Sequence, residues 1–434
     1  MTSRATGVVG ILAGGGNLPR EIAEAVVARG GAVHVVALEG EADADFSAFP
    51  VTPVGWAQIG GMLRALKSAN AAQLVIVGSV TRPDLAALRP DLGFLLNLPA
   101  ILRIIAAGGD DSVLTRVVRF FESHGFHVVG PATVAPALVV RRGPLGSKSA
   151  TPEAEADIAR GLDVVRTLGP FDVGQAVVVT QGRVEAIEGA EGTDGMLARV
   201  AAQRRQKGGA SAPAGVLVKR PKPGQELRID MPAIGPATVA SAAEAGLAGI
   251  AVLAGATLAA RRPELVALAD ARGLFVQGVE DANRSAAAPA AVPAGEWHVG
   301  ALTPAKPDAR QTADATKAAA LLQALDPLLV SAGAVVDRGH VLAVESGEGT
   351  AALIARGGNL RQWGRRRGAR ASGVAVVREA PAVEPSLAAT AVAGLAGLAL
   401  VGEPAAPLRH AVVSEQARRL GLFVAVLAAS MGKA

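Results

Sequence analysis

The segment KRPKPGQELRIDMP, which begins at residue 219, carries the densest set of groups that could act on a phosphate. Its cations could neutralise a diphosphate, whose negative charge otherwise repels a nucleophile. Asp230 could orient a water molecule or bind a metal ion. A plain charged loop is the alternative. The candidates are Asp230 and Arg228 as catalytic groups and Lys219 and Lys222 as binding groups, with Arg220 beside them.

Compact polar groups follow a predicted strand in EGTDGM (residues 191–196). They have the size and type to hydrogen-bond a sugar or a phosphate, or to hold Mg²⁺. We assign Glu191 and Thr193 to substrate binding and Asp194 to the catalytic groups. Asp194 and Asp230 are the candidate metal ligands.

A glycine-rich turn, AGGGNLP (residues 13–19), lies between a predicted strand at 7–13 and a predicted helix. Glycines in such a turn let backbone N–H groups approach a phosphate at the positive end of the helix. The turn is neither GxGxxG nor a P-loop, so a tight turn without a ligand stays an equal alternative. The candidate binding residues are Gly14, Gly15, Gly16, Asn17 and Leu18.

Two further turns add candidate binding residues. GSVTRPD (78–84) follows a buried strand, so Arg82 lies where the ligands of open α/β sheets collect. GGDDSVL (108–114) places Asp110 and Asp111 before a helix, where they either cap it or contact a metal or a substrate hydroxyl. A surface turn is the alternative for Arg82.

Strands and helices alternate along the first part of the chain, which predicts a parallel sheet with right-handed crossovers. We therefore predict an α/β protein with a Rossmann-like parallel-sheet N-terminal domain at residues 1–140. A C-terminal α/β domain at 141–283 carries the catalytic and binding segments. A degenerate repeat of that second domain follows at 297–434, after an Ala/Pro linker at 284–296.

The repeat keeps the residues that form strands and turns and loses the residues that could take part in a reaction. GRVEAIEGAEGTDGML at Gly182 recurs as GHVLAVESGEGTAALI at Gly339, but Ala351 replaces Asp194. GVLVKR recurs as GVAVVR, whereas the Arg228–Asp230 loop has no counterpart. We predict a catalytically empty duplicate of residues 171–280. Its role is then packing: it covers the apolar flank of the first copy or replaces a partner subunit.

Composition narrows the chemistry and the partners. The chain has no Cys and six scattered His without an HExxH pattern, so Mg²⁺ is more plausible than zinc. Its net charge of +5 and pI of about 9.9 favour anionic partners. We see no base-stacking motif and expect no nucleic acid. The start of the chain does not read as a secretory signal.

Two apolar stretches bear on membranes and lipids. LAATAVAGLAGLALVG (387–402) is short for a membrane span, and we predict a helix end followed by a buried strand. LGFLLNLPAILRIIAAGG (92–109) is strongly apolar but interrupted. It predicts a core helix, and a groove for an acyl chain is the alternative.

Taken together, these segments resemble the UDP-2,3-diacylglucosamine diphosphatases of the LpxI type, which act in lipid A synthesis. The resemblance rests on GILAGGGNLP, GSVTRPDL, GGDDSVLTRVVRFFESHGF, GLDVVRTLGPFDVGQAVVV, VEAIEGAEGTDGML, LVKRPKPGQELRIDMPAIGP and AGLAGIAV, in this order across residues 7–280. Chains of that family usually end near residue 280, so the repeat is a departure.

The resemblance implies a cytoplasmic, Mg²⁺-dependent hydrolase at the inner membrane surface. It would split UDP-2,3-diacylglucosamine into UMP and 2,3-diacylglucosamine 1-phosphate, with the substrate between two domains. The essential aspartate of the family falls on Asp230. Two other functions stay open: a nucleotide-binding oxidoreductase, for which Glu39 would be the ribose ligand but the glycine spacing is wrong, and a non-catalytic nucleotide-sugar-binding protein.

Overall fold

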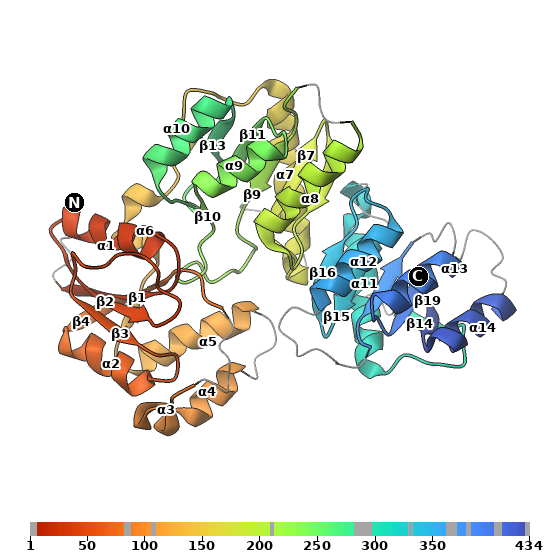
Figure 1. Cartoon of the computed structure of the whole chain (residues 1–434), viewed down its shortest axis with the longest axis horizontal. Coiled ribbons are helices and arrows are strands. Elements are labelled where there is room, and N and C mark those ends of the chain that lie inside the picture. Colours follow the sequence, from red (N-terminus) through yellow and green to blue (C-terminus); the bar gives the residue numbers. More distant parts are fainter. Residues whose placement is uncertain are drawn as a thin grey trace, which may run out of the picture.

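Three α/β lobes follow one another along the chain in the computed structural model (Figure 1). We call them the N-terminal domain (residues 7–138), the middle domain (139–281) and the third domain (297–429). The structure describes residues 7–81, 88–105, 110–208, 212–281, 297–328, 330, 333–361, 371–378, 383–402 and 410–429 of the 434.

The N-terminal domain is built on a five-stranded sheet of order β3-β2-β1-β4-β5, all parallel. Successive residues of β1 face opposite sides: Ile11 packs under α1 and α6, and Leu12 packs under α2 and α5. Helices on both faces explain why these strands are continuously apolar. The elements are β1 (Val8–Ala13), α1 (Leu18–Ala28), β2 (Ala32–Leu38), β3 (Val51–Val54), α2 (Ile59–Ser68), β4 (Ala71–Val77), α3 (Leu92–Leu96), α4 (Leu98–Ile105), α5 (Asp110–Ser123), β5 (His127–Val128), α6 (Pro131–Val134) and the 3₁₀ turn η1 (Pro136–Leu138).

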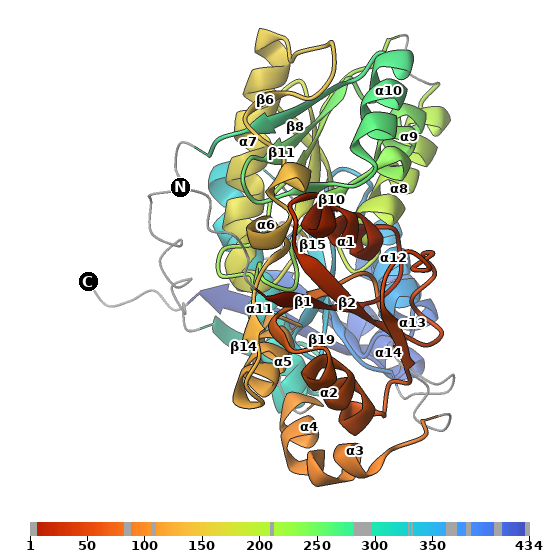
Figure 2. The same ribbon diagram turned by 90° about the vertical axis from the view of Figure 1, so that its left-hand side faces the viewer.

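The prediction of a core helix at 92–109 is wrong. Two short helices, α3 and α4, occupy residues 92–105 at one end of the molecule (Figure 2), and residues 106–109 lie outside the described part of the chain. No residue of α3 is buried, and Leu92 and Leu96 are 71% and 75% exposed. Gly93 lies directly against Gly60 of α2, so the contact that holds α3 is made by backbone rather than by its leucines.

The middle domain has a sheet of order β13-β11-β9-β7-β8, in which β7 is antiparallel to both of its neighbours and the rest is parallel. Helix α7 covers one face, and α8, α9 and α10 cover the other. The elements are β6 (Gly143–Pro144), α7 (Pro152–Leu168), η2 (Gly169–Phe171), β7 (Ala176–Thr180), β8 (Arg183–Ile187), α8 (Gly192–Gln206), β9 (Val216–Lys219), β10 (Ala233–Ile234), α9 (Pro236–Glu244), β11 (Gly249–Leu253), β12 (Leu258–Ala259), α10 (Arg262–Arg272) and β13 (Phe275–Val279), with β10 and β12 paired apart.

The third domain repeats this sheet as β19-β18-β17-β15-β16 and adds β14 beside β19. Even a register shift recurs, between Val178 and Val179 and again between Val335 and Val336. The repeated α/β fold is thereby confirmed. The elements are β14 (Trp297–Ala301), α11 (Ala309–Leu325), η3 (Asp326–Leu328), β15 (Gly333–Asp337), β16 (His340–Val344), α12 (Thr350–Arg361), β17 (Val374–Val377), α13 (Val383–Val392), β18 (Gly397–Val401), α14 (His410–Leu420) and β19 (Phe423–Ala429).

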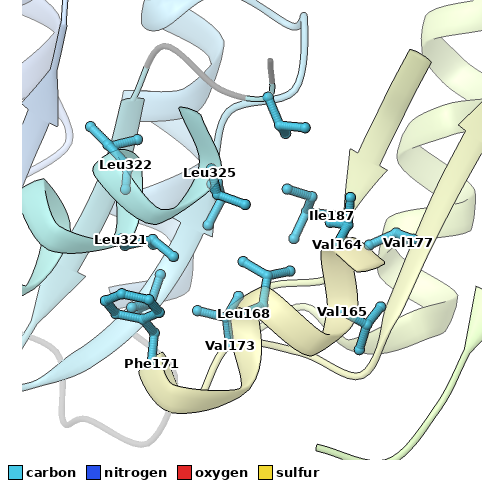
Figure 3. Close-up of a cluster of buried hydrophobic side chains, with 14 of the residues drawn as sticks. Val164, Val165, Leu168, Phe171, Val173, Val177, Ile187, Leu321, Leu322 and Leu325 are labelled. Carbon is cyan, nitrogen blue, oxygen red and sulfur yellow. The ribbon is translucent and has the colours of Figure 1, made fainter. Parts of the chain in front are cut away.

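The middle and third domains share one hydrophobic core (Figure 3). Helix α7 packs against α11, its own counterpart in the repeat. The two helices contribute residues from equivalent positions of the repeat to this core. Val164, Val165 and Leu168 of α7 correspond to three leucines of α11. These are Leu321, Leu322 and Leu325, all fully buried. The repeat therefore covers the apolar flank of the first copy, as its packing role requires.

The domain boundaries stay predictions. The middle sheet ends at Val279 and β14 begins at Trp297, while the predicted linker at 284–296 lies outside the described residues. The second apolar stretch, 387–402, forms the end of α13 and the buried strand β18, as predicted. No helix in the described ranges has both the length and the apolar character that a membrane span needs.

Candidate functional site

A buried lysine lies at the centre of the candidate site. Lys219 is the last residue of β9 and is only 7% exposed. Its Nζ donates to the Thr193 hydroxyl and to the Ala233 carbonyl, both at 3.2 Å. The Thr193 hydroxyl in turn donates to Glu188 Oε1 at 3.2 Å. Thr193 belongs to the first turn of α8, so the helix and the strand end meet at this point.

The charges of three carboxylates, those of Glu188, Asp194 and Asp230, act on the Lys219 ammonium group. Burial lowers the pKa of Lys219, and the three carboxylates oppose that shift. Burial likewise raises the pKa of Glu188, although Lys219 opposes the shift. The structure thus gathers Thr193, Asp194, Lys219 and Asp230, which the sequence pointed to on two separate segments. Glu188 was missed, because its recurrence as Glu345 marks it as scaffold.

Asp230 is exposed and held in place by Gln225. The Gln225 side-chain amide donates to Asp230 Oδ2 at 2.5 Å and to the Asp230 carbonyl at 2.9 Å. Gln225 Oε1 also accepts from the Lys222 backbone N–H at 2.8 Å. This glutamine folds the loop back on itself and fixes the carboxylate. Sequence reasoning missed it, since a glutamine within a charged loop gives no signal of its own.

The loop that carries Asp230 docks on the N-terminal domain. It descends from the end of β9 towards that domain in Figure 1, and Ile229 packs against the cluster under α5. Arg228 pairs with Glu226 at 2.6 Å and with Glu122 of α5 at 3.0 Å. Hydrogen bonding to Glu226 raises the pKa of Arg228. Arg228, predicted as a catalytic group, therefore links the middle domain to the N-terminal domain in this structure. Glu226 and Glu122 neutralise its charge.

A pocket of about 410 Å³ opens between the middle and third domains. Of the predicted site residues, Asp230 and Lys222 line it, and Lys222 forms an ion pair there with Asp172. Glu188 also lines the pocket, which brings it to the edge of the Lys219 cluster. The remaining lining residues are Gly174, Gln175, Gly189, Ala190, Gly192 and Gln225 of the middle domain and Asp337, Arg338, His340, Val341, Leu342, Leu360 and Arg361 of the third domain.

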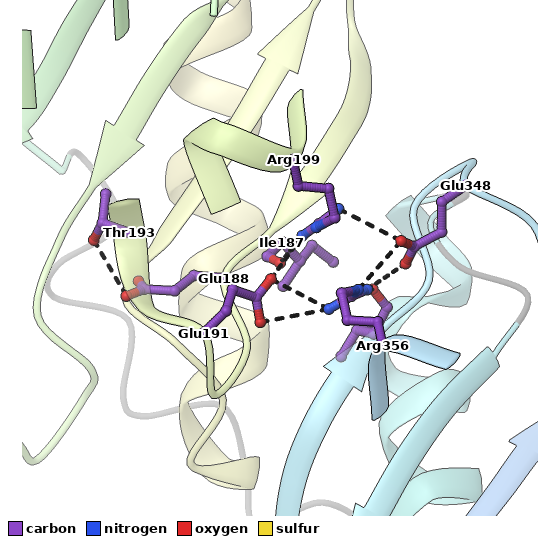
Figure 4. A network of polar contacts seen from close by, with 8 residues as sticks. Ile187, Glu188, Glu191, Thr193, Arg199, Glu348 and Arg356 are labelled. Atoms are coloured by element: carbon purple, nitrogen blue, oxygen red, sulfur yellow. Dashed lines mark hydrogen bonds and ion pairs between the residues drawn. The ribbon is translucent and has the colours of Figure 1, made fainter. Parts of the chain in front are cut away.

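Glu191 lies outside the Lys219 cluster and joins the two copies of the repeat (Figure 4). Its carboxylate accepts from Arg199 at 2.9 Å and from Arg356 of α12 at 3.2 Å. Glu348, the counterpart of Glu191, pairs with Arg356, and one of its oxygens lies 3.9 Å from Arg199. Each carboxylate thus contacts the arginine of its own copy and that of the other. The structure uses Glu191 at this interface, and its role as a substrate ligand stays a prediction.

The glycine turn after β1 uses its N–H groups within the protein. Gly14 N–H donates to the Val77 carbonyl at 2.9 Å, and Gly15 N–H donates to the Ser79 carbonyl at 2.7 Å. Gly16 N–H donates to Asp43 Oδ1 at 2.7 Å. Each of the three N–H groups has a partner within the protein, which favours the alternative of a tight turn without a ligand.

Close packing explains these glycines instead. A Cβ atom on Gly14 would lie 2.5 Å from the Ser79 carbonyl oxygen, where no side chain fits. Asn17 donates to Glu21 Oε1 at 2.8 Å, and Leu18 begins α1. The turn lies between β1 and β4, where the strand order reverses and ligands of such sheets bind. A binding role for its side chains stays a prediction.

The remaining predicted site residues lie at the limits of the described part of the chain. Arg82 is outside the described residues. Asp110 and Asp111 form the first turn of α5, but their side chains are not described. Their binding roles stay predictions.

Comparison with known families now bears on this arrangement. The model of the LpxI N-terminal domain matches residues 8–138, and that of the LpxI C-terminal domain matches twice, at 141–277 and at 298–425. The chain belongs to the LpxI family. It is similar to the UDP-2,3-diacylglucosamine pyrophosphatase LpxI of Caulobacter vibrioides, with 43% identity over 277 residues, which are 64% of this chain and 99% of that relative.

The second match confirms that the repeat is an LpxI C-terminal domain, and the structure shows what this copy has lost. Val377 ends β17 as Lys219 ends β9, and Ala351 stands at the position of Asp194. Glu345 keeps the position of Glu188, but its Oε1 accepts from the Gly349 N–H at 3.2 Å. The ammonium group and a carboxylate beside it are thus missing together from the second copy.

The first copy offers carboxylates in a form that suits Mg²⁺. In the described ranges, no group of three or more histidine and acidic side chains is arranged to hold a metal by itself. Mg²⁺ typically takes one or two carboxylates together with substrate phosphates and water. Asp194 and Asp230, whose charges both act on the Lys219 ammonium group, would supply the two carboxylates of such a donor set.

Proposed function

We propose that this chain hydrolyses the diphosphate of UDP-2,3-diacylglucosamine to UMP and 2,3-diacylglucosamine 1-phosphate. The observation that carries the proposal is the Lys219 cluster: a buried cation with Asp194 and Asp230 beside it, in a chain of the LpxI family whose Caulobacter relative bears that activity in its name. Water adds its oxygen to one phosphorus, and the bond from that phosphorus to the bridging oxygen breaks.

Each residue of the cluster has a role that follows from its placement. The exposed Asp230 carboxylate, fixed by Gln225, positions the attacking water and accepts its proton. The Lys219 ammonium group holds Thr193 and the carboxylates in place and offsets negative charge as it develops on the phosphates. The positive end of α8, at Thr193 and Asp194, acts in the same direction.

Asp194 and Asp230 are the proposed ligands of Mg²⁺. When bound there with the substrate, the ion supplies charge neutralisation at the phosphate oxygens. Nothing in the described ranges favours the oxidoreductase alternative, because the N–H groups of Gly14 and Gly15 that a dinucleotide would need are used within the protein.

Product analysis tests the proposed activity. The purified chain is incubated with UDP-2,3-diacylglucosamine and Mg²⁺, and products are separated by chromatography and identified by mass. Equal amounts of UMP and diacylglucosamine 1-phosphate are expected. UDP together with free diacylglucosamine would show cleavage at the sugar instead, and unchanged substrate would show no activity; either result refutes the proposal.

A lipid substrate requires access to a membrane, and α3 and α4 offer the surface for it. Leu92, Leu95, Leu96 and Leu102 are all more than half exposed, at one end of the molecule (Figure 2). Exposed Arg103 follows on α4 and can approach anionic headgroups. We propose that this leucine surface (Leu92, Leu95, Leu96, Leu98 and Leu102) rests on the inner membrane, so that the protein is cytoplasmic and peripheral.

Vesicle binding tests the leucine surface. The Leu95→Ser, Leu96→Ser double variant is expected to sediment less with vesicles that contain phosphatidylglycerol than the unchanged chain does. Val392→Ser is a matched control, because Val392 is 91% exposed but lies on α13 of the third domain. Equal loss in both variants, or in neither, would rule out a membrane contact at α3 and α4.

We also propose that the third domain replaces a partner subunit. At the contact between the middle and third domains, α7 packs against α11. Glu191 of the first copy contacts Arg356 of the second, and Glu348 of the second contacts Arg199 of the first. Such reciprocal contacts are the pattern of a two-fold interface. The repeat then provides, within one chain, the pair of C-terminal domains that a shorter chain would form only by dimerisation.

A further inference from the structure

The pocket beside Asp230 has walls from two domains. Asp230, Lys222 and Glu188 line it from the middle domain, and Arg338 and His340 line it from the third. The third domain therefore contributes side chains to the pocket of the first copy although it has lost its own site residues. Arg338 is exposed, and in the described part of the chain its guanidinium has no hydrogen-bond or ion-pair partner.

The hairpin that carries Arg338 is fixed by α11. The Arg338 and Gly339 N–H groups donate to the Asp314 carboxylate at 2.8 and 2.6 Å. Lys317 Nζ donates to the Gly339 carbonyl at 2.6 Å. The charges of Asp172 and Lys222 both act on the pKa of Lys317, which places the three side chains near one another. The turn is thus anchored next to the Asp230 loop, and its geometry is set before any ligand arrives.

The first copy shows what is specific to Arg338. Its equivalent hairpin is held in the same way, since Gln181 and Gly182 N–H groups donate to Asp157 at 3.0 and 2.6 Å. Gln181 and Arg338 both have a positive φ, of 51° and 54°. The two turns therefore share one backbone and differ at this position in charge. The turn of the middle domain has Gln181 at this position. The turn of the third domain has Arg338, and this is the turn that reaches the Asp230 pocket.

We propose that Arg338 binds a phosphate oxygen of the substrate in the Asp230 pocket. A guanidinium suits phosphate because it presents fixed N–H donors and always carries its charge. Lys222, the lining cation that belongs to the Asp230 loop, is paired with Asp172. The inference rests on the proposed hydrolysis for the identity of the substrate. It makes the third domain a contributor to binding as well as a packing partner.

Arg338→Gln is the deciding variant, because it installs the residue that the first copy already has at the same backbone geometry. We expect kcat/KM for UDP-2,3-diacylglucosamine to fall about tenfold or more, mainly through KM, with the unfolding temperature unchanged. Arg338→Lys should restore part of the loss. The matched control is Arg183→Gln, which removes an exposed cation from the equivalent hairpin of the first copy and should leave kcat/KM unchanged.

Three outcomes decide the inference. A selective loss in Arg338→Gln supports it, whereas equal effects of Arg338→Gln and Arg183→Gln overturn it. If the unchanged chain does not hydrolyse the lipid nucleotide, the proposed function fails, and inorganic diphosphate becomes the probe. Calorimetry must then show at least fivefold weaker diphosphate binding in Arg338→Gln than in Arg183→Gln. Equal binding, or none by the unchanged chain, overturns the inference independently of the reaction.

Discussion

At the scale of single residues, Lys219 links the fold to the chemistry. A buried ammonium group without partners would cost several kcal/mol, so it needs the carboxylates whose charges act on it. The pattern in the third domain is consistent with this dependence. Asp194 is replaced by Ala351 there and Lys219 by Val377, so the ammonium group and one of its carboxylates are absent together while Glu345 remains.

The pH dependence of the reaction tests the role of Lys219. Burial lowers its pKa, so its charge is lost at a lower pH than that of an ordinary lysine. We expect kcat/KM to fall on the alkaline side as Lys219 deprotonates. Lys219→Arg keeps its charge throughout this range and should move that decline to higher pH, whatever its absolute rate.

The chain is suited to this measurement because it has no Tyr and no Cys to titrate in the same range. Rates are compared from neutral to alkaline pH, with circular dichroism at each pH to confirm that both proteins stay folded. An alkaline decline at the same pH in both proteins would assign it to another group and remove Lys219 from the charge balance of the site.

The sequence points to the charged members of the proposed site and misses the residues that hold them in place. Asp230 and Lys219 are recognisable because they lie in the segment with the densest set of groups that could act on a phosphate. Glu188 and Gln225 are not, since one resembles a strand end and the other a neutral loop residue. Glu191 and Arg228 have the residue types of ligands, yet the fold uses both in ion pairs between domains. Such pairings depend on tertiary contacts that spacing along the chain does not contain.

At the scale of elements, alternating strands and helices predict the N-terminal sheet correctly, because helices on both faces require continuous apolar strands. The prediction fails at residues 92–105, where the apolar pattern is the same but five leucines stay exposed. An apolar sequence pattern indicates that a surface is removed from water. It does not indicate whether protein or lipid covers that surface. The glycine turn shows a similar limit, since close packing and phosphate binding favour the same residue.

Gly15→Val distinguishes these two reasons for the glycine turn. Its Cβ would lie 2.8 Å from Ser79 Oγ and 3.0 Å from the Glu41 carbonyl oxygen. We expect a loss of about 1–3 kcal/mol in the free energy of unfolding, as for other overpacked sites. Gly7→Val is the control, because a Cβ there meets no atom within 4 Å. Unchanged stability with weakened UMP binding would contradict the packing explanation and restore the phosphate role.

At the scale of the whole molecule, the repeat builds a two-fold interface within one chain. Sequence alone predicts the duplication from the recurrence at Gly182 and Gly339, and it predicts that the second copy is empty. It does not show that the hairpin at Arg338 reaches the pocket of the first copy. That contact depends on how two domains dock, and no residue of the hairpin indicates its distant partner.

Truncation after residue 285 tests the interface. It exposes Val164, Val165 and Leu168, so we expect residues 1–285 to associate as a dimer through α7, seen as a doubled mass by light scattering. The Asp230 chemistry should persist with kcat/KM near that of Arg338→Gln, because the second copy in such a dimer presents Gln181. The isolated fragment 285–434 should fold and release no UMP.

Leu168→Glu in the truncated chain serves as the control and should return it to a monomer. A truncated chain that is monomeric without this substitution would contradict the interface. A truncated chain that keeps the full kcat/KM would instead contradict the contribution of the third domain to the pocket.

The central claim is that one site, organised around Asp230, performs the hydrolysis for a chain that contains two copies of the fold. Its most direct test is the rate of UMP release by full-length Asp230→Asn, measured against the unchanged chain under the same conditions. The substitution keeps the shape of the side chain, so the fold should persist. We predict less than about a tenth of the original rate, a barrier increase of at least 1.4 kcal/mol. A variant that retains roughly half of the rate would reveal a second working site, and one that retains all of it would remove Asp230 from the reaction.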